Sequence, residues 1–410
     1  MTEQPFRTEI DKLRPASGAR MRGIIVDALP SVAPALAISV WQAGAPWYEA
    51  YGGWLDPETR TTRAGFSTAW DLASVSKLFT ATALLRLAND FKLDLDDPVV
   101  EVIPELGAGP RGVDGGQDPL SWELLPVPAE RAEWTVDPAR VTYRQLLTHT
   151  SGLAPWRALF AATGPTPPPP DEPDPLPSDE RMAAALEAIG GYRLVARPGE
   201  EFHYSDLGFI LLGAAVARRF GRPLDEAMQA LIRDRLGLDS LTYRPLDAGR
   251  ALERLAPTEV DARWRARRCW GEVHDENAAG LGGSAGHAGL VAPGHDVARF
   301  GVAWLRRDPR LRLERFMRAA VTNQTPEASA ARGLGWQVQP TDHLAPFSDQ
   351  AYGHTGFTGT SLAIDPRRDL VVAVCTNRVY HGRDPEGIDR LRLQLHETIA
   401  EVTEAGIAPS

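Results

Sequence analysis

A serine and a lysine stand three residues apart in the segment WDLASVSKLFTATALLRL, residues 70–87. The apolar residues that follow predict an amphipathic helix over 74–89, and helical spacing places Ser74 and Lys77 on one face, a turn apart. At a helix N-terminus, oriented backbone N–H groups favour negative charge on the serine oxygen or a nearby oxyanion. A desolvated lysine can take the hydroxyl proton, because burial lowers the pKa of its amine. The same pair is also typical of an N-cap serine before a surface lysine, but the apolar neighbours of Lys77 favour a packed environment.

Lysine is rare in this chain. Lys12, Lys77 and Lys92 are the only lysines among the 44 basic residues, and all the others are arginines. An arginine keeps its proton, because its pKa stays above about 12. Chemistry that needs a titratable amine is therefore restricted to these three positions, and only Lys77 follows a serine by three residues.

Five segments resemble, in the same order, those of the serine β-lactamases and penicillin-binding proteins, in particular the class C β-lactamase-like esterases and peptidases. The segments are 73–87, 141–153, 197–213, 274–290 and 353–366, and the resemblance covers roughly residues 30–400. Ser-x-x-Lys and Lys-Thr-Gly are recognised marks of these enzymes. One such segment would be suggestive, whereas five in the family's order support the resemblance strongly.

The resemblance implies a set of catalytic roles. Ser74 would be the nucleophile and Lys77 its proton partner, while Tyr204 would carry protons to the leaving group and from the hydrolytic water. The backbone N–H groups of Ser74 and Phe357 would form the oxyanion hole. These parts suffice for acyl transfer, because they supply an activated hydroxyl, an acid/base partner and two donors for the developing oxyanion.

The chain departs from the family pattern at two positions expected to contact the substrate. The family's second motif, which is Tyr204-Ser205-Asp206 in this chain, usually ends in asparagine. Asp206 should hold a nearby Lys77 protonated and cannot donate a hydrogen bond to an acyl-amide carbonyl. The third motif, His354-Thr355-Gly356, begins with a histidine where the family has a lysine. Histidine is mostly neutral at pH 7 and anchors a substrate carboxylate poorly. Both changes weaken β-lactam and D-Ala-D-Ala recognition more than ester hydrolysis, so the esterase-like branch is favoured.

Other histidines receive structural or binding interpretations. We expect His149 to fix a loop by hydrogen bonding. The cluster at 274–276 lacks a further ligand at helical spacing, so we expect no metal there. The glycines of 280–290 should let the backbone approach a ligand closely, and His287 is expected to line the same pocket.

The element pattern predicts an α/β (α+β) fold, with an antiparallel sheet built from both chain ends, flanking helices and an inserted, mostly helical region. Strands are predicted at 34–41, 46–54, 360–365 and 370–377, and helices at 16–30, 74–89, 142–148, 180–189, 206–220, 224–235, 296–306 and 388–402. Asp206, Asp225 and Asp296 stand where N-caps belong. We expect one catalytic domain over 1–410, composed of an α/β sub-region (1–72 plus 297–410) and a helical sub-region (73–296). The latter would carry an exposed proline-rich loop at 163–178.

Composition and charge exclude several classes of binding partner and indicate a cellular compartment. With 54 acidic and 44 basic residues the net charge is −10, which argues against nucleic acid or an anionic membrane surface as the main partner. The longest apolar run, 207–217, is about half of what a membrane span requires. Cys269 and Cys375 are expected to be buried free thiols, although one bridge between them stays open. The first residues have no apolar core of a signal peptide, which indicates a cytoplasmic protein, or a periplasmic one if its start was trimmed.

The sequence thus predicts a serine hydrolase that forms an acyl-enzyme with carboxylic esters or small amides and needs no cofactor or metal. One alternative is a D-Ala-D-Ala carboxypeptidase, D-aminopeptidase or β-lactamase. An alternative of another class is a binding protein that keeps the fold but has lost turnover, for which Asp206 would be the reason.

Overall fold

A seven-stranded antiparallel sheet joins the two ends of the chain. The computed structural model describes residues 5–384 and 386–404. The strand order is β1-β3-β2-β13-β12-β11-β10. The strands are β1 (Phe6–Asp11), β2 (Ala35–Gln42), β3 (Ala45–Gly53), β10 (Gln337–Val338), β11 (Tyr352–Thr355), β12 (Ser361–Asp365) and β13 (Leu370–Thr376). The join is the pairing of β2 with β13, in which Leu36 lies opposite Thr376 and Gln42 opposite Leu370. The predicted fold class and the origin of the sheet are confirmed.

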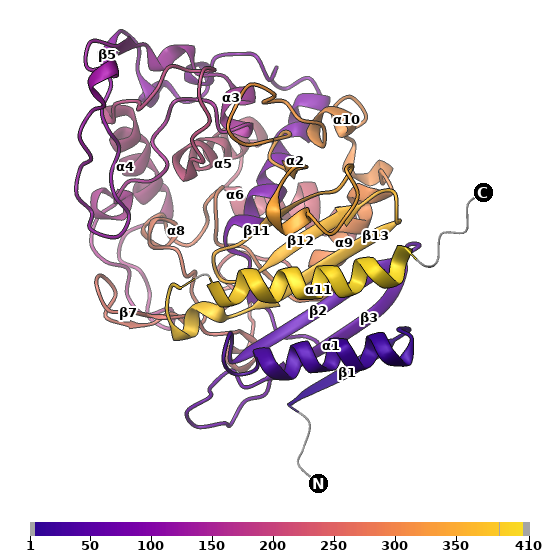
Figure 1. Cartoon of the computed structure of the whole chain (residues 1–410). Helices are drawn as coiled ribbons and strands as arrows, with labels where there is room; N and C mark the ends of the chain where they lie inside the picture. The colour runs from indigo at the N-terminus through magenta and orange to yellow at the C-terminus, as the bar shows by residue number, and fades with distance from the viewer. Residues whose placement is uncertain (1–4, 385, 405–410) are drawn as a thin grey trace.

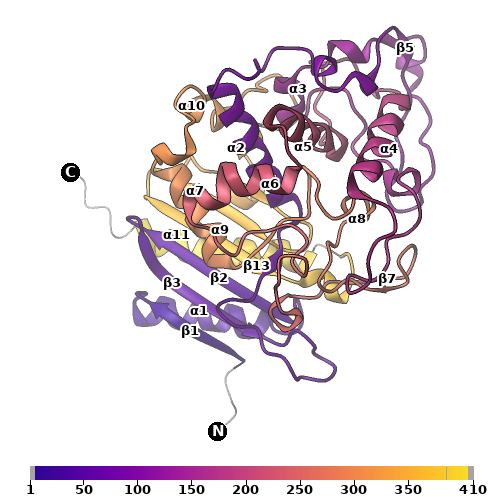
Figure 2. The same ribbon diagram turned by 180° about the vertical axis from the view of Figure 1, so that it is seen from behind.

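Both faces of the sheet are covered by helices, which explains why its central strands are apolar on both sides. On β13, Val372 and Val374 pack with α1 (Pro15–Ala28) and α11 (Glu386–Glu404). Val371 and Ala373 point to the other face, toward α9 (Gly294–Leu305). Figure 1 shows α1 and α11 together on one side, and Figure 2 shows α9 on the opposite side of the strands.

The region between the sheet halves contains further helices and long connections. They are α2 (Ser76–Asn89), α3 (Tyr143–Leu147), α4 (Ser178–Gly191), α5 (Asp206–Phe220), α6 (Leu224–Met228), a π-helical segment (Gln229–Arg233), α7 (Asp234–Leu236), α8 (Glu276–Gly280) and α10 (Met317–Ala320). Short strand pairs are β4 (Trp70–Asp71) with β9 (Val291–Ala292), β5 (Arg111–Gly112) with β6 (Thr135–Val136), and β7 (Val260–Asp261) with β8 (Arg267–Arg268).

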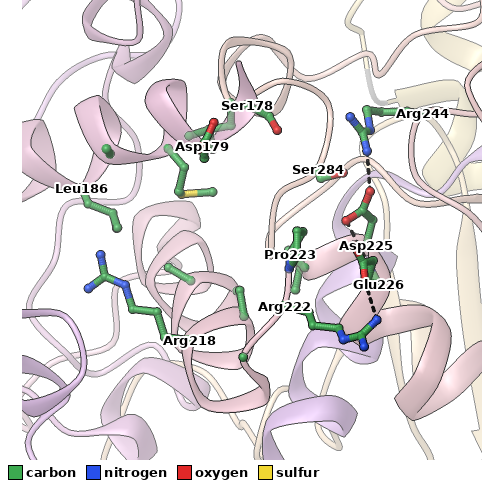
Figure 3. Close-up of a pocket in the computed structure, with 18 residues that line it drawn as sticks. Ser178, Asp179, Leu186, Arg218, Arg222, Pro223, Asp225, Glu226, Arg244 and Ser284 are labelled. Carbon is green, nitrogen blue, oxygen red and sulfur yellow. Dashed lines mark hydrogen bonds and ion pairs between the residues drawn. The ribbon is translucent and has the colours of Figure 1, made fainter. Parts of the chain in front are cut away.

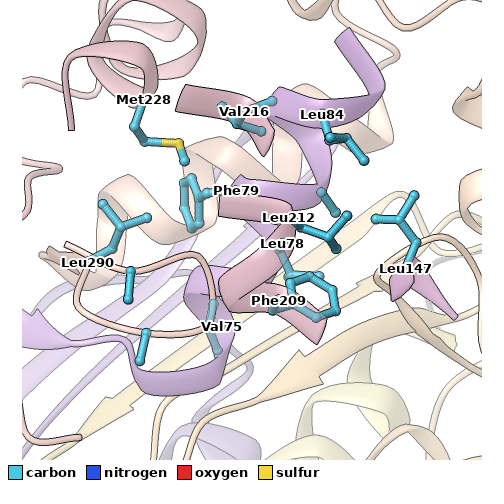
Figure 4. Packing of buried hydrophobic residues seen from close by; sticks show 14 of the residues in the cluster. Val75, Leu78, Phe79, Leu84, Leu147, Phe209, Leu212, Val216, Met228 and Leu290 are labelled. Atoms are coloured by element: carbon cyan, nitrogen blue, oxygen red, sulfur yellow. The ribbon is translucent and has the colours of Figure 1, made fainter. Parts of the chain in front are cut away.

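Helix α2 lies at the centre of this region. Every residue from Ser76 to Ala88 is buried, so the helix is enclosed on all sides, although an amphipathic helix with an exposed face was predicted. Leu78 and Phe79 of α2 pack with Phe209 and Leu212 of α5 (Figure 4). Thr82, one of the polar residues of α2, finds a partner within the helix, since its hydroxyl donates to the carbonyl of Leu78 at 2.6 Å. This packing holds the start of α2 rigidly.

The predicted strands and helices are confirmed to within a few residues, but the three N-cap predictions are wrong. Ser205 caps α5, because its Oγ accepts from the N–H of Gly208 at 3.2 Å and Asp206 is already the first helical residue. Asp225 and Asp296 lie inside the first turns of α6 and α9, where their charge meets the positive end of the helix dipole.

The structure also bears on the proline-rich loop, the two cysteines and the question of a membrane-spanning helix. Residues 165–177, within the predicted proline-rich loop, form neither helix nor strand, as expected. Cys269 and Cys375 are both buried free thiols. Within the described residues, none of the helices combines the length and apolar character that crossing a membrane requires.

Candidate active site

Ser74 lies on a short 3-10 turn (Ala73–Val75) that leads from β4 into α2. Ala73 has a φ of 44°, a left-handed conformation that costs energy for a residue with a side chain. Asp71 stabilises it, because its Oδ1 accepts from the N–H of Ala73 at 2.7 Å while Oδ2 accepts from the N–H of His274, also at 2.7 Å. The turn presents Ser74 half-buried, beside the fully buried Lys77.

Oxygen atoms from remote segments of the chain surround the Lys77 ammonium. Nζ donates to Ser74 Oγ at 2.8 Å and to the carbonyl of His287 at 3.2 Å, and it forms an ion pair with Asp206 Oδ1 at 2.7 Å. Burial alone would lower the pKa of Lys77, but attraction to Asp206, and then to Tyr204, outweighs it, so the pKa is raised. In the free protein, Lys77 therefore carries a proton at neutral pH. The prediction that Asp206 would keep it protonated agrees with this geometry.

Tyr204 is positioned by the loop that precedes α5. Its ring centroid lies 5.0 Å from Lys77 Nζ, 4.5 Å from the His149 ring and 6.0 Å from the His354 ring. His149 Nδ1 accepts from the N–H of Ser205 at 3.0 Å, which confirms the loop-fixing role predicted for this histidine. Burial lowers the pKa of His149 well below its usual value, so the ring stays neutral and can accept.

Strand β11 and the turn after it form the adjacent wall. His354 is buried and its Nδ1–H donates to the carbonyl of Thr355 at 2.7 Å. Burial, then the charges of Arg332 and Lys77, lower the pKa of His354 well below normal, so the ring is neutral. Gly356 lets the turn approach Ser74, because a Cβ there would lie 2.6 Å from the carbonyl oxygen of Leu72.

The two predicted oxyanion donors lie on these adjoining turns. Within the described residues, neither the N–H of Ser74 nor that of Phe357 donates a hydrogen bond, which leaves both available to a ligand. The turn that carries Phe357 is tied to the segment before Ser74, because the hydroxyls of Thr358 and Thr360 both donate to the carbonyl of Asp71, at 2.7 and 3.0 Å.

His287 contributes mainly through its backbone. Its carbonyl accepts from Lys77, while its ring is buried and lies 2.8 Å from Asp275 Oδ1. Contact between that ring and a substrate stays a prediction. The neighbouring residues of the 274–276 cluster face different partners, since the His274 ring meets Glu259 at 2.9 Å and Glu276 pairs with Arg383 at 2.5 Å.

Arg332 is a candidate site residue that sequence reasoning missed. Its guanidinium lies 5.0 Å from the Phe202 ring and 5.8 Å from the Tyr204 ring. It lowers the pKa of both His149 and His354, which places its charge close to the site. No carboxylate among the described residues pairs with it. No motif marks Arg332 in the sequence, because one arginine among many carries no signal of its position.

A separate cavity of about 530 Å³ lies between α4, α5 and α6. Leu186 and Leu224 belong to its apolar lining, and at its rim Asp225 pairs with Arg244 and Glu226 with Arg222 (Figure 3). None of the predicted site residues lines this cavity. The candidate active site is therefore defined by the cluster around Ser74 and not by this hollow.

Replacing Asp206 with asparagine should release the proton of Lys77 more easily. The pKa of Lys77 should fall by on the order of one unit or more, because the attraction that outweighs burial is removed. If neutral Lys77 limits the rate at low pH, a lower pKa moves the acid limb of kcat/KM to lower pH. Acylation by a β-lactam should also improve relative to ester hydrolysis, because the amide can donate a hydrogen bond.

The measurement is a pair of pH–rate profiles with a p-nitrophenyl ester and nitrocefin. Asp225→Asn is the matched control, since Asp225 lies in the first turn of another helix and pairs with Arg244. An unchanged acid limb together with an unchanged ester-to-lactam ratio would mean that Asp206 does not control the proton of Lys77.

Comparisons with known proteins agree with this architecture. A family model described as Beta-lactamase matches residues 25–397. A curated protein of Salmonella enteritidis PT4 (strain P125109), "Putative D-alanyl-D-alanine carboxypeptidase", is 30% identical over 336 residues, 77% of this chain and 71% of that protein. The octameric penicillin-binding protein homologue from Pyrococcus abyssi superimposes with a TM-score of 0.64 at 21% identity, covering 92% of this chain and 77% of the other. EstCE1, "a hydrolase with promiscuous acyltransferase activity", gives 0.64 at 22% identity, covering 92% and 98%. The two structural likenesses show the fold.

Proposed function

Because the chain belongs to the Beta-lactamase family, we propose that it is a serine hydrolase that forms an acyl-enzyme on Ser74. The observation that carries the proposal is the 2.8 Å contact between Ser74 Oγ and the buried Nζ of Lys77, beside Tyr204. In the reaction, Ser74 Oγ attacks the substrate carbonyl, and the N–H groups of Ser74 and Phe357 stabilise the oxyanion. In molecules whose Lys77 amine is neutral, Lys77 takes the proton of Ser74 as the attack occurs, and Tyr204 passes a proton from Lys77 to the leaving group.

Carboxylic esters or small amides are the substrates that we propose. His354 is neutral and buried, so it offers a substrate carboxylate no positive charge. Asp206 stands where the family has an amide donor, which disfavours recognition of an acyl-amide side chain. An ester needs neither contact for attack at its carbonyl. The solved structure of EstCE1, itself described as a hydrolase with acyltransferase activity, supports an acyl-transfer role on this fold.

A carboxypeptidase is the second candidate, and Arg332 favours it. Its guanidinium lies beside Tyr204 without a carboxylate partner among the described residues, and such a group binds a carboxylate by two parallel hydrogen bonds. A peptide with a terminal carboxylate, such as one ending in D-Ala-D-Ala, would supply that partner. The curated relatives named as putative D-alanyl-D-alanine carboxypeptidases support this candidate.

Arg332→Gln separates the two candidates. If Arg332 anchors a carboxylate, kcat/KM for a D-Ala-D-Ala peptide should fall about 10-fold or more, because a charged hydrogen bond of roughly 1.5–3 kcal/mol is lost. Hydrolysis of p-nitrophenyl acetate, which has no carboxylate, should change little. Arg318→Gln is the control, since Arg318 is exposed on the nearby α10. Equal effects on both substrates would rule out carboxylate anchoring.

A binding protein without turnover is the remaining alternative, for which the protonated Lys77 is the reason. A fluorophosphonate probe tests the hydrolase proposal against it, because only an activated serine reacts. Labelling at Ser74, identified by peptide mass spectrometry, supports a hydrolase, and absence of labelling in a folded protein supports the alternative. A screen of p-nitrophenyl esters, nitrocefin and D-amino-acid peptides then identifies the substrate class.

A further inference from the structure

We propose that Arg392 of α11 is a positioning residue that orients and strengthens the Phe357 N–H donor of the oxyanion hole. This inference rests on the proposed function. It assigns a contribution to catalysis to the C-terminal helix α11, and none of the five family segments of this sequence lies on that helix.

Arg392 reaches the active-site turn from the neighbouring helix. Its side chain is only 6% exposed, and a single nitrogen, Nη2, donates to the carbonyl of Gly356 and to that of Thr360, both at 2.9 Å. Nη1 contacts Asp389 Oδ1 at 3.1 Å on the same helix. Burial lowers the pKa of Arg392 to about 10, so the guanidinium remains cationic at neutral pH.

The carbonyl of Gly356 and the N–H of Phe357 belong to the same peptide unit. That unit is trans and planar, so holding the oxygen fixes the direction of the N–H on its opposite side. A charged donor on the carbonyl also polarises the amide, which makes its N–H a stronger donor to negative charge. Arg392 therefore acts on the transition state through Phe357 without touching the substrate.

The turn has other anchors that do not depend on Arg392. The N–H of Gly356 donates to the carbonyl of Thr360 at 2.7 Å, and the N–H of Gly359 returns to the carbonyl of Gly356 at 3.0 Å. The hydroxyls of Thr358 and Thr360 bind the carbonyl of Asp71 from the side of Ser74. Loss of Arg392 should therefore leave the turn in place, but the Gly356 carbonyl would keep one donor, the N–H of Gly359, instead of two. The Gly356–Phe357 peptide would be held less firmly and polarised less, which weakens one oxyanion donor.

The test compares Arg392→Met and Arg392→Lys with Arg390→Gln, an exposed arginine of the same helix that serves as the control. For Arg392→Met, kcat should fall about 10- to 100-fold, less than the loss of an entire oxyanion donor, while KM changes less than about twofold. Affinity for a boronic acid, whose adduct on Ser74 is tetrahedral, should fall by the same factor as kcat. Arg392→Lys should recover part of both losses, because an ammonium can also donate to the two carbonyls.

Circular dichroism and thermal melting establish whether the variants are folded. If Arg392→Met does not fold, Arg392→Lys is used for the same measurements. Unchanged kcat and boronate affinity in folded Arg392 variants overturn the inference. The inference is also overturned if KM rises by the same factor by which kcat falls and Arg392→Lys recovers neither, because that result indicates a structural role. Wild-type protein that is not labelled at Ser74 overturns the proposed function itself, which separates the two failures.

Discussion

Ser74→Ala should abolish turnover and covalent labelling while the protein stays folded. The substitution removes the nucleophile, so kcat should fall by about 10³-fold or more, as is usual when an enzyme loses its attacking group. The fold should tolerate the change, because Ser74 is half-buried and its Oγ accepts one hydrogen bond, from Lys77. The measurements are ester hydrolysis, fluorophosphonate labelling and a thermal melt.

Ser67→Ala is the matched control, since Ser67 is an exposed serine on the loop before β4. It should leave all three measurements unchanged. Labelling that persists in Ser74→Ala on another serine would show that the nucleophile lies elsewhere. Activity that persists without labelling would exclude an acyl-enzyme on Ser74.

Lys77→Arg should be nearly as damaging as Lys77→Ala. The ammonium fits between Ser74 Oγ, the His287 carbonyl and Asp206, and the side chain is entirely buried. A planar guanidinium is larger than this space and cannot release a proton at working pH. Both variants should lose about 10²- to 10⁴-fold in kcat/KM, the range that general acid–base groups contribute.

Lys92→Arg provides the control, because Lys92 is exposed beyond the end of α2. Kinetics of the purified variants should be accompanied by thermal melts, since Lys77→Ala leaves the Asp206 carboxylate without its ion-pair partner. If Lys77→Arg retained most of the activity, Lys77 would be a fixed positive charge, and Tyr204 would have to accept the proton of Ser74.

Local sequence determined the elements whose side-chain pattern is strong. The nearly continuous apolar runs of 34–41 and 370–377 predicted the central strands, because a short strand that is covered by helices on both faces is apolar on both. The spacing of Ser74 and Lys77 predicted their proximity, because residues three apart on a helix share a face. Strand β1 has a single buried residue, Phe6, so its pairing with β3 was not recognisable from the pattern.

Tertiary structure decided the electrostatics of the site. Asp206, Arg332 and the carbonyl of His287 come from segments more than a hundred residues from Lys77 in the chain, and no spacing rule relates them. The three predicted N-caps failed because a cap depends on which neighbouring residue turns its side chain back to the helix, as Ser205 does. Arg392 reaches Gly356 only because α11 packs near the end of β11. Sequence patterns record periodicity along the chain, whereas the proton held on Lys77 depends on distances and burial that arise only when remote segments pack together.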